Sequence, residues 1–460
     1  MSDLHVVILA AGKGTRMKSS RPKVLHRVAG KPMIEYVLEV AGGLGPKSVT
    51  LVVGHLRETL QQALAARANL RFVAQEPQLG TGHALLQAAP LLEREHGVVV
   101  LLSGDVPLLT RHTVERLLAG HLTSGAAATV LTAMVDQPYG YGRIVRQGGT
   151  ITHIVEERDA SPAQRNIKEI NSGIFAFSIG PLFGALRSLA AGNAQGEYYL
   201  TDLVSAFRRQ NLGVETVTLE DSDEIRGINS RSELAEASKI VRQKKNDELM
   251  AAGVTIEDPA TAYIDADVTI GADTVIHPNV YLEGNTTIGA ACEIHSGARI
   301  INSVLGDRVI VQNFCVVTSS RLASGVSIGP FAHLRPDSDL RESVHIGNFV
   351  ELKKVVVGAG SKAGHLTYLG DATIGEKVNV GAGTITCNYD GEMKHQTVIE
   401  DGAFIGSDTQ LVAPVKVGRG AYIGSGTTVR EDVPPGALGV SAGKQRNIEG
   451  WKEKRKRKGS

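Results

Sequence analysis

The sequence predicts two folded domains joined by a long helix: an α/β domain with a mostly parallel sheet, and a solenoid of short β-strands. Three observations support this prediction. Apolar runs alternate with amphipathic stretches in the first half, a segment rich in helix formers follows, and an aliphatic residue then returns every sixth position from Ile264 to Val429. A chain of 460 residues also exceeds what one hydrophobic core usually serves. We therefore expect domains at residues 1–229 and 253–460 and a helical linker at residues 230–252.

The first half of the chain has the pattern of alternating strands and helices. The runs His5–Leu9, Val49–Val53 and Val98–Ser103 are almost continuously apolar, as a parallel sheet covered by helices on both faces requires. Helical stretches such as Met33–Ala41 and Thr59–Ala68 lie between them. Ligands of such sheets bind at the carboxyl ends of the strands. We expect the chemistry of this domain at that edge.

The first predicted strand ends in a glycine loop. The loop reads LAAGKGTRM from Leu9 to Met17, and Arg21-Pro22-Lys23 follows. Its glycines let the backbone approach phosphates, and its basic residues bring positive charge. The loop lacks the third glycine of a dinucleotide-binding fingerprint and the GK[ST] ending of an ATPase loop, which disfavours both alternatives. The whole string resembles the signature of sugar-phosphate nucleotidyltransferases, which implies a Rossmann-like fold and UTP as a substrate.

Further segments extend this resemblance in the order of the family: QEPQLGTGHA from Gln75, Ser103-Gly104-Asp105, Tyr141-Gly142-Arg143, and EINSGI around Asn171. By similarity, Gln75 with the backbone of Gly80 and Thr81 would read uracil, and Gly142, Glu156 and Asn171 would hold the sugar. For Gly80 and Gly142 alone, turn chemistry is an equally good explanation. The implied nucleotide-sugar site comprises Leu9, Ala10, Ala11, Gly12, Lys13, Gly14, Lys23, Gln75, Gly80, Thr81, Ser103, Gly104, Asp105, Gly142, Glu156, Asn171 and Asn229.

Asp105 is the candidate magnesium ligand. It follows an apolar strand and precedes Val106-Pro107, so we expect its carboxylate at the ligand-binding edge. Mg²⁺ prefers hard oxygen ligands. The alternative is an aspartate that caps the following turn. The resemblance adds the amide oxygen of Asn229 as a second ligand.

The reaction implied by the resemblance is attack of a sugar-1-phosphate oxygen on the α-phosphorus of UTP, which expels pyrophosphate. Because the attacking group is already an anion, positioning and electrostatic stabilisation do most of the work. Lys13, Arg16, Lys23 and Mg²⁺ would supply the positive charge, and Arg16 and Lys23 are the catalytic candidates. The alternative for Lys23 is an ordinary surface lysine.

The linker and the start of the solenoid follow from helix signals. Residues 230–252 are rich in helix formers, begin with capping residues and end at Gly253. Pro259 stops this pattern, and we expect the solenoid to start near Tyr263.

The six-residue period occurs in three phases, and we predict that its aliphatic residues point inward. A period of six disfavours a meandering antiparallel sheet, whose period is two. The pattern resembles the hexapeptide left-handed β-helix of acyltransferases, which implies that handedness, a three-sided prism and a homotrimer. The phases are Ile264, Ile270, Ile276, Leu282, Ile288, Ile294 and Ile300; Val304, Ile310, Val316, Leu322, Ile328, Leu334, Leu340, Ile346 and Leu352; and, after the weaker Val356, Ile374 and Val380, Ile399, Ile405, Leu411, Val417, Ile423 and Val429.

The period falters between Leu352 and Ile399, where His365 is a candidate general base. Acetyl transfer to an amino sugar needs a base near neutral pH, and histidine has an unperturbed pKa of about 6.5. A lone histidine is more often structural. However, GHLTYLGD around His365 and NVGAGTITCNYDG from Asn379 resemble the acetyltransferase domain of the bifunctional N-acetylglucosamine-1-phosphate uridyltransferase and glucosamine-1-phosphate acetyltransferase family.

This second resemblance implies further site residues. Glu351 would orient His365, and backbone N–H groups or Ser407 would stabilise the oxyanion. Solvated surface charge is the alternative for the basic residues, and corner geometry for Asn379 and Asn388. The sugar-phosphate set is Arg335, Lys353, Tyr368, Asn379 and Lys394, and the acetyl-CoA set is Asn388, Tyr389, Ser407 and Ser425, with Ala382 in the same combined site. Where some family members carry an arginine for the CoA phosphates, this chain has Ala442, and Lys444 or Arg446 are candidate replacements.

The resemblance spans nearly the whole chain and implies two reactions: acetylation of glucosamine-1-phosphate by acetyl-CoA, then uridylation of N-acetylglucosamine-1-phosphate by UTP. The product, UDP-N-acetylglucosamine, serves bacterial envelope synthesis, including peptidoglycan and lipopolysaccharide precursors. One alternative is a single-activity sugar-phosphate nucleotidyltransferase with a structural or regulatory solenoid. Another is a non-catalytic assembly subunit.

Charge and hydropathy limit the partners. Lys and Arg number 49 and Asp and Glu 48, so a net charge of +1 provides no field for nucleic acid or an anionic membrane. The basic run Lys452–Lys458 fits a solvated tail better than an RNA-binding arm. The apolar stretch Val6–Ala11 lacks a basic leader, and no run approaches the roughly 20 residues of a membrane span. We expect a cytoplasmic protein whose partners are its small-molecule substrates.

Overall fold

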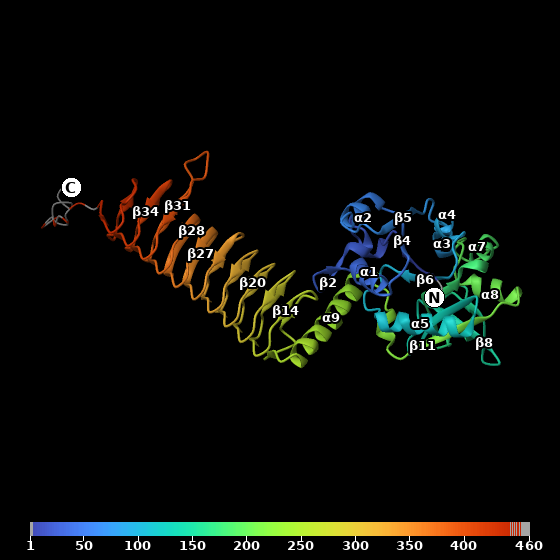
Figure 1. Cartoon of the computed structure of the whole chain (residues 1–460). Coiled ribbons are helices and arrows are strands. Elements are labelled where there is room, and N and C mark those ends of the chain that lie inside the picture. Colours follow the sequence, from blue (N-terminus) through green and yellow to red (C-terminus); the bar gives the residue numbers. More distant parts are fainter. Residues whose placement is uncertain are drawn as a thin grey trace, which may run out of the picture. The chain divides into compact units, whose positions relative to one another are not determined.

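The computed structural model describes residues 3–441 and, beyond them, residues 443, 445, 447, 449 and 451 (Figure 1). The candidate CoA-phosphate residues Lys444 and Arg446 lie outside the described residues, as do Ala442 and the basic run 452–458. The chain divides into two compact units, Met1–Val241 and Arg242–Ser460. No helix in the described part of the chain is long and apolar enough to cross a membrane.

The first unit contains a nine-stranded mixed sheet. Its central order is β11-β7-β10-β6-β1-β4-β5, in which β10 is the antiparallel member, and the hairpin β8-β9 joins through β10. The mostly parallel sheet predicted from the apolar runs is confirmed, with an antiparallel strand that the sequence did not indicate. The strands are β1 Leu4–Ala10, β4 Ser48–Val53, β5 Leu70–Ala74, β6 Val98–Ser103, β7 Ala128–Met134, β8 Gly142–Gln147, β9 Thr150–Val155, β10 Glu169–Ser178 and β11 Val214–Leu219; β2 Arg27–Val28 and β3 Lys31–Pro32 pair separately.

Helices cover both faces of this sheet. Along β1, Val6 and Ile8 face one apolar cluster with α1, α2 and α5, whereas Val7 faces another with α3, α4, α7 and α8. This alternation explains why the strand is apolar throughout. The helices are α1 Met33–Gly43, α2 Arg57–Ala63, α3 Thr81–Leu86, α4 Ala89–Leu92, α5 Arg111–Ser124, α6 Pro162–Arg165, α7 Ile179–Arg187 and α8 Asp202–Arg209, with short 3₁₀ helices at Thr15–Met17, Lys23–Leu25 and Ser222–Ile225.

Helix α9, Arg231–Ala251, is the predicted long helix. Its first part packs into a small cluster of the first unit through Ala237. Its last part belongs to the second unit, where Leu249 joins the solenoid core and the Asn246 amide donates to the carbonyl of Pro259 at 3.0 Å. The boundary between the two units falls within this helix.

The second unit is a solenoid of parallel strands, consistent with the left-handed β-helix (Figure 1). Its strands form three ladders, each pairing once per coil, and β27 His345–Val357 and β28 Lys362–Ile374 pass through all three. The first ladder contains β12 Thr255–Ile256, β15 Val275–Ile276, β18 Glu293–Ile294, β21 Ile310–Val311, β24 Ser327–Ile328, β29 Asn379–Val380, β32 Phe404–Ile405, β35 Tyr422–Ile423 and β37 Leu438–Gly439. The second contains β13 Tyr263–Ile264, β16 Tyr281–Glu283, β19 Arg299–Ile301, β22 Val316–Thr318, β25 His333–Leu334, β30 Ile385–Cys387, β33 Gln410–Val412 and β36 Thr428–Val429. The third contains β14 Thr269–Ile270, β17 Thr287–Ile288, β20 Val304–Leu305, β23 Arg321–Leu322, β26 Ser338–Leu340, β31 Thr397–Ile399 and β34 Val415–Val417.

The solenoid begins before the predicted start near Tyr263. Strand β12 already pairs with β15, with Ile256 beside Ile276. The six-residue period does not reach Ile256 because a turn at Asp258, whose carboxylate accepts from the Thr261 hydroxyl at 2.8 Å, adds residues between β12 and β13.

The predicted inward positions are correct at both ends of the array and wrong in part of the middle. Val304 and Ile310 are 40% and 37% exposed, whereas their neighbours Leu305 and Val311 are buried. The inward position shifts by one residue after Ile300, and aliphatic residues occupy both sides of these strands. Val316 is likewise not the inward residue of its strand, since the next residue, Val317, is the buried one. Val356 also faces outward, between buried Val355 and Val357.

The faltering segment has a structural cause. In the coil that follows β28, Thr386 takes an inward position that is aliphatic in most coils. Residues 388–396 then form a loop, closed by a bridge between Tyr389 and Lys394, that projects from the coils just before β31 (Figure 1).

Candidate active sites

A cavity of about 440 Å³ opens at the carboxyl ends of β1 and β6. Leu9 and Ser103 are paired in register, so the glycine loop and Asp105 leave the sheet side by side. Eleven predicted site residues line this cavity: Leu9, Ala10, Ala11, Gly12, Lys13, Lys23, Gln75, Gly80, Thr81, Ser103 and Asp105. Residues that the sequence did not single out complete the lining: Pro22, Val24, His55, Gln78, Ala84 and Glu197.

The glycine loop is held against Lys23. Gly14 has a φ of +60°, and a Cβ there would lie 2.7 Å from the Cβ of Lys23. A side chain at Gly14 is therefore excluded on two grounds, the left-handed backbone and this contact. Arg16, in contrast, is exposed in the Thr15–Met17 turn and does not line the cavity.

Lys23, Asp105 and Asn229 meet at the cavity wall. The Lys23 ammonium contacts the Asp105 carboxylate and lies 2.6 Å from the amide oxygen of Asn229. The Asp105 carbonyl also accepts from the Ile228 N–H at 2.9 Å, which brings the end of the first unit to β6. Two oxygens thus converge on one cation, and carboxylate and amide oxygens are the hard ligand type that Mg²⁺ prefers. A surface lysine, the alternative for Lys23, is excluded by its 12% side-chain exposure.

The segment after β5, which was predicted to read the base, folds onto the cavity through glutamine side chains. The buried Gln75 amide donates to the Gly80 carbonyl at 2.9 Å, which fixes the turn where Gly80 has a φ of +103°. Gln78 donates to the Ala11 carbonyl at 2.7 Å and ties this segment to the glycine loop. Gln78 belongs to the QEPQLGTGHA string, but the string does not reveal its role, because that role depends on a contact across the sheet edge.

The three residues predicted to hold the sugar lie together. A Cβ built on Gly142 would lie 3.5 Å from both the Asn171 Cβ and the Glu156 carboxylate. Burial raises the pKa of Glu156, and its carboxylate accepts from the Thr201 hydroxyl at 2.9 Å. Gly142, Asn171 and Asn229 are not lining residues of the first cavity, and Glu156 lines a second cavity of about 470 Å³.

In the solenoid, His365 lies in a column of corner residues. Each member of the column stands two positions after an inward residue. Backbone hydrogen bonds join neighbouring coils at this corner; for example, the Asp408 N–H donates to the Ala382 carbonyl at 2.7 Å. Asn348 is beside His365 in register. The column contains Asn348, His365, Ala382, Ser407 and Ser425. Four of these five were predicted, and Asn348 was not.

Asn348 fixes the tautomer of His365. Its amide oxygen lies 2.6 Å from Nδ1 of the imidazole. Because an amide oxygen only accepts, Nδ1 carries the proton and Nε2 of the neutral ring carries a lone pair. Within this chain the Glu351 carboxylate accepts from Arg335 at 3.0 Å, and the orienting role expected for Glu351 stays a prediction.

Positive side chains gather at the next corner of the prism. The Lys394 ammonium lowers the pKa of Lys353, and desolvation and Arg335 lower it further. Such crowding of cations suits an anion such as a phosphate. Lys394 lies on the projecting loop, where it forms a bridge with Tyr389.

Asn388 and Tyr368 lie beside the cations. The buried Asn388 amide donates to the Asp371 carboxylate at 2.5 Å, and a Cβ on Gly370 would meet the Tyr368 hydroxyl and this same amide. Tyr389 is exposed on the loop, and Asn379 is exposed on β29.

Within one chain, the base and the cations start from neighbouring corners of the coil. Gly370 is paired with Lys353 in register, and residues 366–369 lie between Gly370 and His365. This segment turns a corner at Leu366, which has a φ of +46°.

Known protein families match three parts of the chain. Residues 6–160 match the MobA-like NTP transferase domain, residues 260–357 the GMPPB C-terminal domain, and residues 396–431 six repeats of the bacterial transferase hexapeptide. The acyltransferase-type repeats and the nucleotidyltransferase domain expected from the sequence are thereby confirmed.

Relatives match the chain over its full length. It is 50% identical over 459 residues to the bifunctional protein GlmU of Pelobacter propionicus, which covers 100% of both chains. It is 51% identical over 446 residues to that of Trichlorobacter lovleyi, covering 97% of each, and 50% identical over 455 residues to that of Heliobacterium modesticaldum, covering 99% and 98%. The chain belongs to the family of bifunctional GlmU proteins, with a nucleotidyltransferase domain followed by a hexapeptide-repeat transferase domain.

Proposed function

We propose that this protein makes UDP-N-acetylglucosamine in two reactions at separate sites. The solenoid transfers an acetyl group from acetyl-CoA to glucosamine-1-phosphate. The first domain then transfers the uridyl group of UTP to N-acetylglucosamine-1-phosphate and releases pyrophosphate. The observation that carries the first reaction is the hydrogen bond between Asn348 and Nδ1 of His365, because it leaves Nε2 free to act as a base.

In the acetyl transfer, His365 Nε2 removes a proton from the substrate ammonium group. The free amine attacks the thioester carbonyl of acetyl-CoA, and the tetrahedral intermediate collapses with loss of the CoA thiolate, which takes up a proton. Arg335, Lys353 and Lys394 hold the sugar phosphate, with Tyr368 and Asn379 as further contacts. Asn388, Tyr389, Ala382, Ser407 and Ser425 contact acetyl-CoA, and Ser407 is an oxyanion donor.

In the uridyl transfer, a phosphate oxygen of the sugar attacks the α-phosphorus of UTP in line with the leaving pyrophosphate. Lys13 and Lys23 neutralise the phosphates, and the exposed Arg16 joins them when the loop closes on UTP. Gln75, Gly80 and Thr81 read the base, and Gly142, Glu156 and Asn171 hold the sugar. Asp105 and Asn229 hold Mg²⁺, which when bound lowers the cost of bringing like charges together.

We further propose a homotrimer in which the acetyl site is shared between chains. The support is that, within one chain, His365 and the cations start from neighbouring corners of the coil, with Gly370 and not His365 paired with Lys353. A second copy that places its cations beside His365 completes the site. Co-expression of the His365→Ala and Lys353→Ala chains should then restore acetyl transfer, because some sites in the mixed trimers combine two intact halves. If each chain works alone, the same co-expression restores no activity.

We assign the domains to residues 1–229 and 253–460, with residues 230–252 as the linker, and we place the protein in the cytoplasm, where its small anionic substrates occur. The test of the whole proposal is a pair of assays on the purified full-length chain. Free thiol release is measured with glucosamine-1-phosphate and acetyl-CoA, and pyrophosphate release with N-acetylglucosamine-1-phosphate and UTP. We expect both. Pyrophosphate without thiol would instead support a single-activity nucleotidyltransferase.

A further inference from the structure

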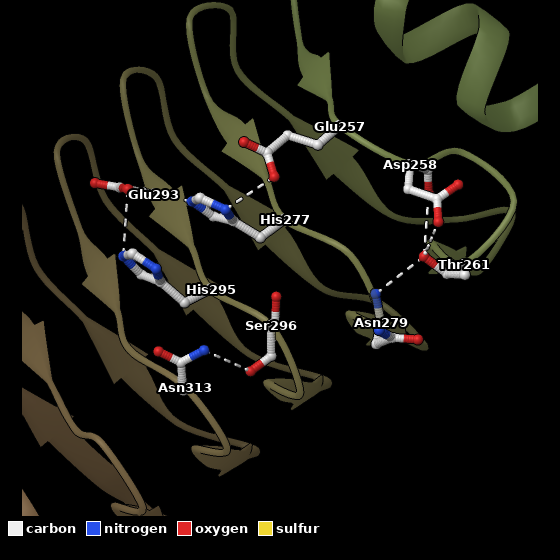
Figure 2. A network of polar contacts seen from close by, with 9 residues as sticks. All are labelled: Glu257, Asp258, Thr261, His277, Asn279, Glu293, His295, Ser296 and Asn313. Atoms are coloured by element: carbon white, nitrogen blue, oxygen red, sulfur yellow. Dashed lines mark hydrogen bonds and ion pairs between the residues drawn. The ribbon is translucent and has the colours of Figure 1, made fainter.

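Two histidines and two glutamates form a separate cluster at the first coils of the solenoid (Figure 2). Glu257 follows β12, His277 follows β15, and His295 follows β18, so they stand one above another on successive coils. Glu293 lies two residues before His295, on the same side of the strand, because Ile294 between them points inward. Neither active site uses any of these residues.

The cluster presents three possible metal ligands to one point. Nε2 of His277 lies 3.2 Å and Nε2 of His295 lies 3.3 Å from the same oxygen of Glu293. All three atoms lie within 4.8 Å of one another. The two imidazole rings are nearly parallel, with centroids 4.5 Å apart and an angle of 9°. Figure 2 shows both rings and the Glu293 carboxylate turned toward each other outside the coils.

Glu257 provides the outer support that metal-binding histidines usually have. Its carboxylate lies 3.1 Å from Nδ1 of His277. A histidine ligand commonly donates its other ring N–H to a carboxylate, which fixes the ring and raises the basicity of the ligating nitrogen. While Nδ1 of His277 faces Glu257, its Nε2 faces Glu293 and is the nitrogen available to a metal ion.

The cluster brings two carboxylates to the same pair of imidazoles. Within the described part of the chain, the ion-pair partners of Glu257 and Glu293 are these two histidines, with no lysine or arginine. A cation among the three ligand atoms would satisfy all of them at once.

We propose that His277, His295 and Glu293 bind a divalent transition metal ion of the Zn²⁺ class, with Glu257 as the outer partner of His277. Two imidazoles and one carboxylate form a known zinc ligand set, and solvent supplies the remaining position because the side chains are partly exposed. Imidazole ligands favour zinc over magnesium. The site is therefore chemically distinct from the oxygen pair Asp105 and Asn229.

A metal here would join two successive coils at the end of the solenoid. Terminal repeats have a neighbour on one side only and depend on special capping contacts. The ion would cross-link β15 and β18 from outside, in addition to the inward packing of Ile276 and Ile294. The predicted effect is stabilisation of the solenoid, since a ligand that binds the folded state raises its stability.

The test is a calorimetric titration of zinc chloride alone into the chelator-treated full-length protein near neutral pH. We expect the wild type to bind one Zn²⁺ per chain at a site that His295→Ala and Glu293→Gln weaken about 100-fold, whereas Glu257→Gln weakens it about 10-fold. The matched control is His333→Ala, an exposed strand histidine of the same solenoid outside the cluster, which should bind like the wild type. Magnesium chloride should give no binding that depends on His295.

Thermal unfolding provides a second readout. Zinc should raise the melting temperature of the wild type and of His333→Ala, and at the same concentration should raise that of Glu293→Gln much less. Glu293→Gln preserves the shape of the side chain, so its metal-free melting temperature reports whether the variant is folded. Equal zinc affinity and stoichiometry in the wild type, His295→Ala and Glu293→Gln would overturn the proposal, as would a wild type that binds no zinc.

Discussion

The amide oxygen of Asn348 lies 2.6 Å from Nδ1 of His365, one coil away on the same corner of the solenoid. This contact determines which imidazole nitrogen can accept a proton. It also links His365, the proposed base, to the repeat architecture, because register between coils places the two side chains together. Asn348 is thus a positioning residue for His365.

Asn348→Ala is expected to lower acetyl transfer about 10-fold to 100-fold, because the neutral ring loses the preference for a proton on Nδ1. The effect should appear in kcat more than in KM for either substrate, and uridyl transfer should not change. Asn313→Ala is the matched control, since Asn313 occupies the equivalent corner two coils earlier, after inward Val311. Equal acetyl-transfer rates in the two variants would rule out the positioning role.

Lys353 predicts a pH dependence of acetyl transfer. Its pKa is lowered, chiefly by Lys394. It therefore loses its proton at a lower pH than a free lysine, and kcat/KM for glucosamine-1-phosphate should fall on the alkaline side as the phosphate loses a cation. In Lys394→Ala the pKa of Lys353 returns toward its ordinary value, so this alkaline limb should move to higher pH.

The same Lys394 variant should raise KM for glucosamine-1-phosphate about 10-fold near neutral pH, because a hydrogen bond to a charged group contributes about 1.5–3 kcal/mol. The measurement is a kcat/KM profile against pH for both proteins. An alkaline limb that stays in place, or moves to lower pH, would show that Lys353 does not contact the phosphate.

Gly14→Ala should separate backbone strain from damage to the nucleotide site. The left-handed backbone at Gly14 costs an alanine roughly 1 kcal/mol, and its Cβ would in addition displace Lys23. Gly45 has a similar φ of +65° with open space around it, so Gly45→Ala carries the strain alone. Both variants should lose similar stability in denaturant unfolding. Only Gly14→Ala should lose uridyl transfer, and retention of that activity would argue against the proposed role of Lys23.

A pair of neighbouring residues tests the inward register of the solenoid. Leu305→Ala should destabilise the protein by about 2–5 kcal/mol because it leaves a cavity in the core. Val304→Ala should change the free energy of unfolding by less than about 0.5 kcal/mol, because Val304 is on the surface. Urea unfolding of both variants measures the difference. A larger loss in the Val304 variant would contradict the register described above.

The sequence predicted the features that depend on local chemistry. The aliphatic residues at every sixth position from Ile264 to Ile300 point inward because each six-residue unit repeats one strand and one corner. The glycine loop lies at a strand end because apolar strands of this kind form parallel sheets. Motif strings were long enough to identify residues such as Asp105 and His365. These features needed no knowledge of which segments lie side by side.

The remaining features depend on contacts between distant segments. Asn348, Gln78 and the zinc-type cluster were not predicted, because each depends on a neighbour in another coil or loop. The register error at Val304 has a different cause. Both Val304 and Leu305 are aliphatic, and only the pairing of β20 with β17 and β23 decides which of them is buried.

The central claim is that two independent active centres lie in one chain, and paired assays of His365→Ala and Asp105→Ala test it most directly. Thiol release and pyrophosphate release are measured for both variants and for the wild type. We predict that His365→Ala lowers acetyl transfer at least about 100-fold with uridyl transfer near normal, and that Asp105→Ala does the reverse. Loss of both activities in either folded variant would contradict the claim.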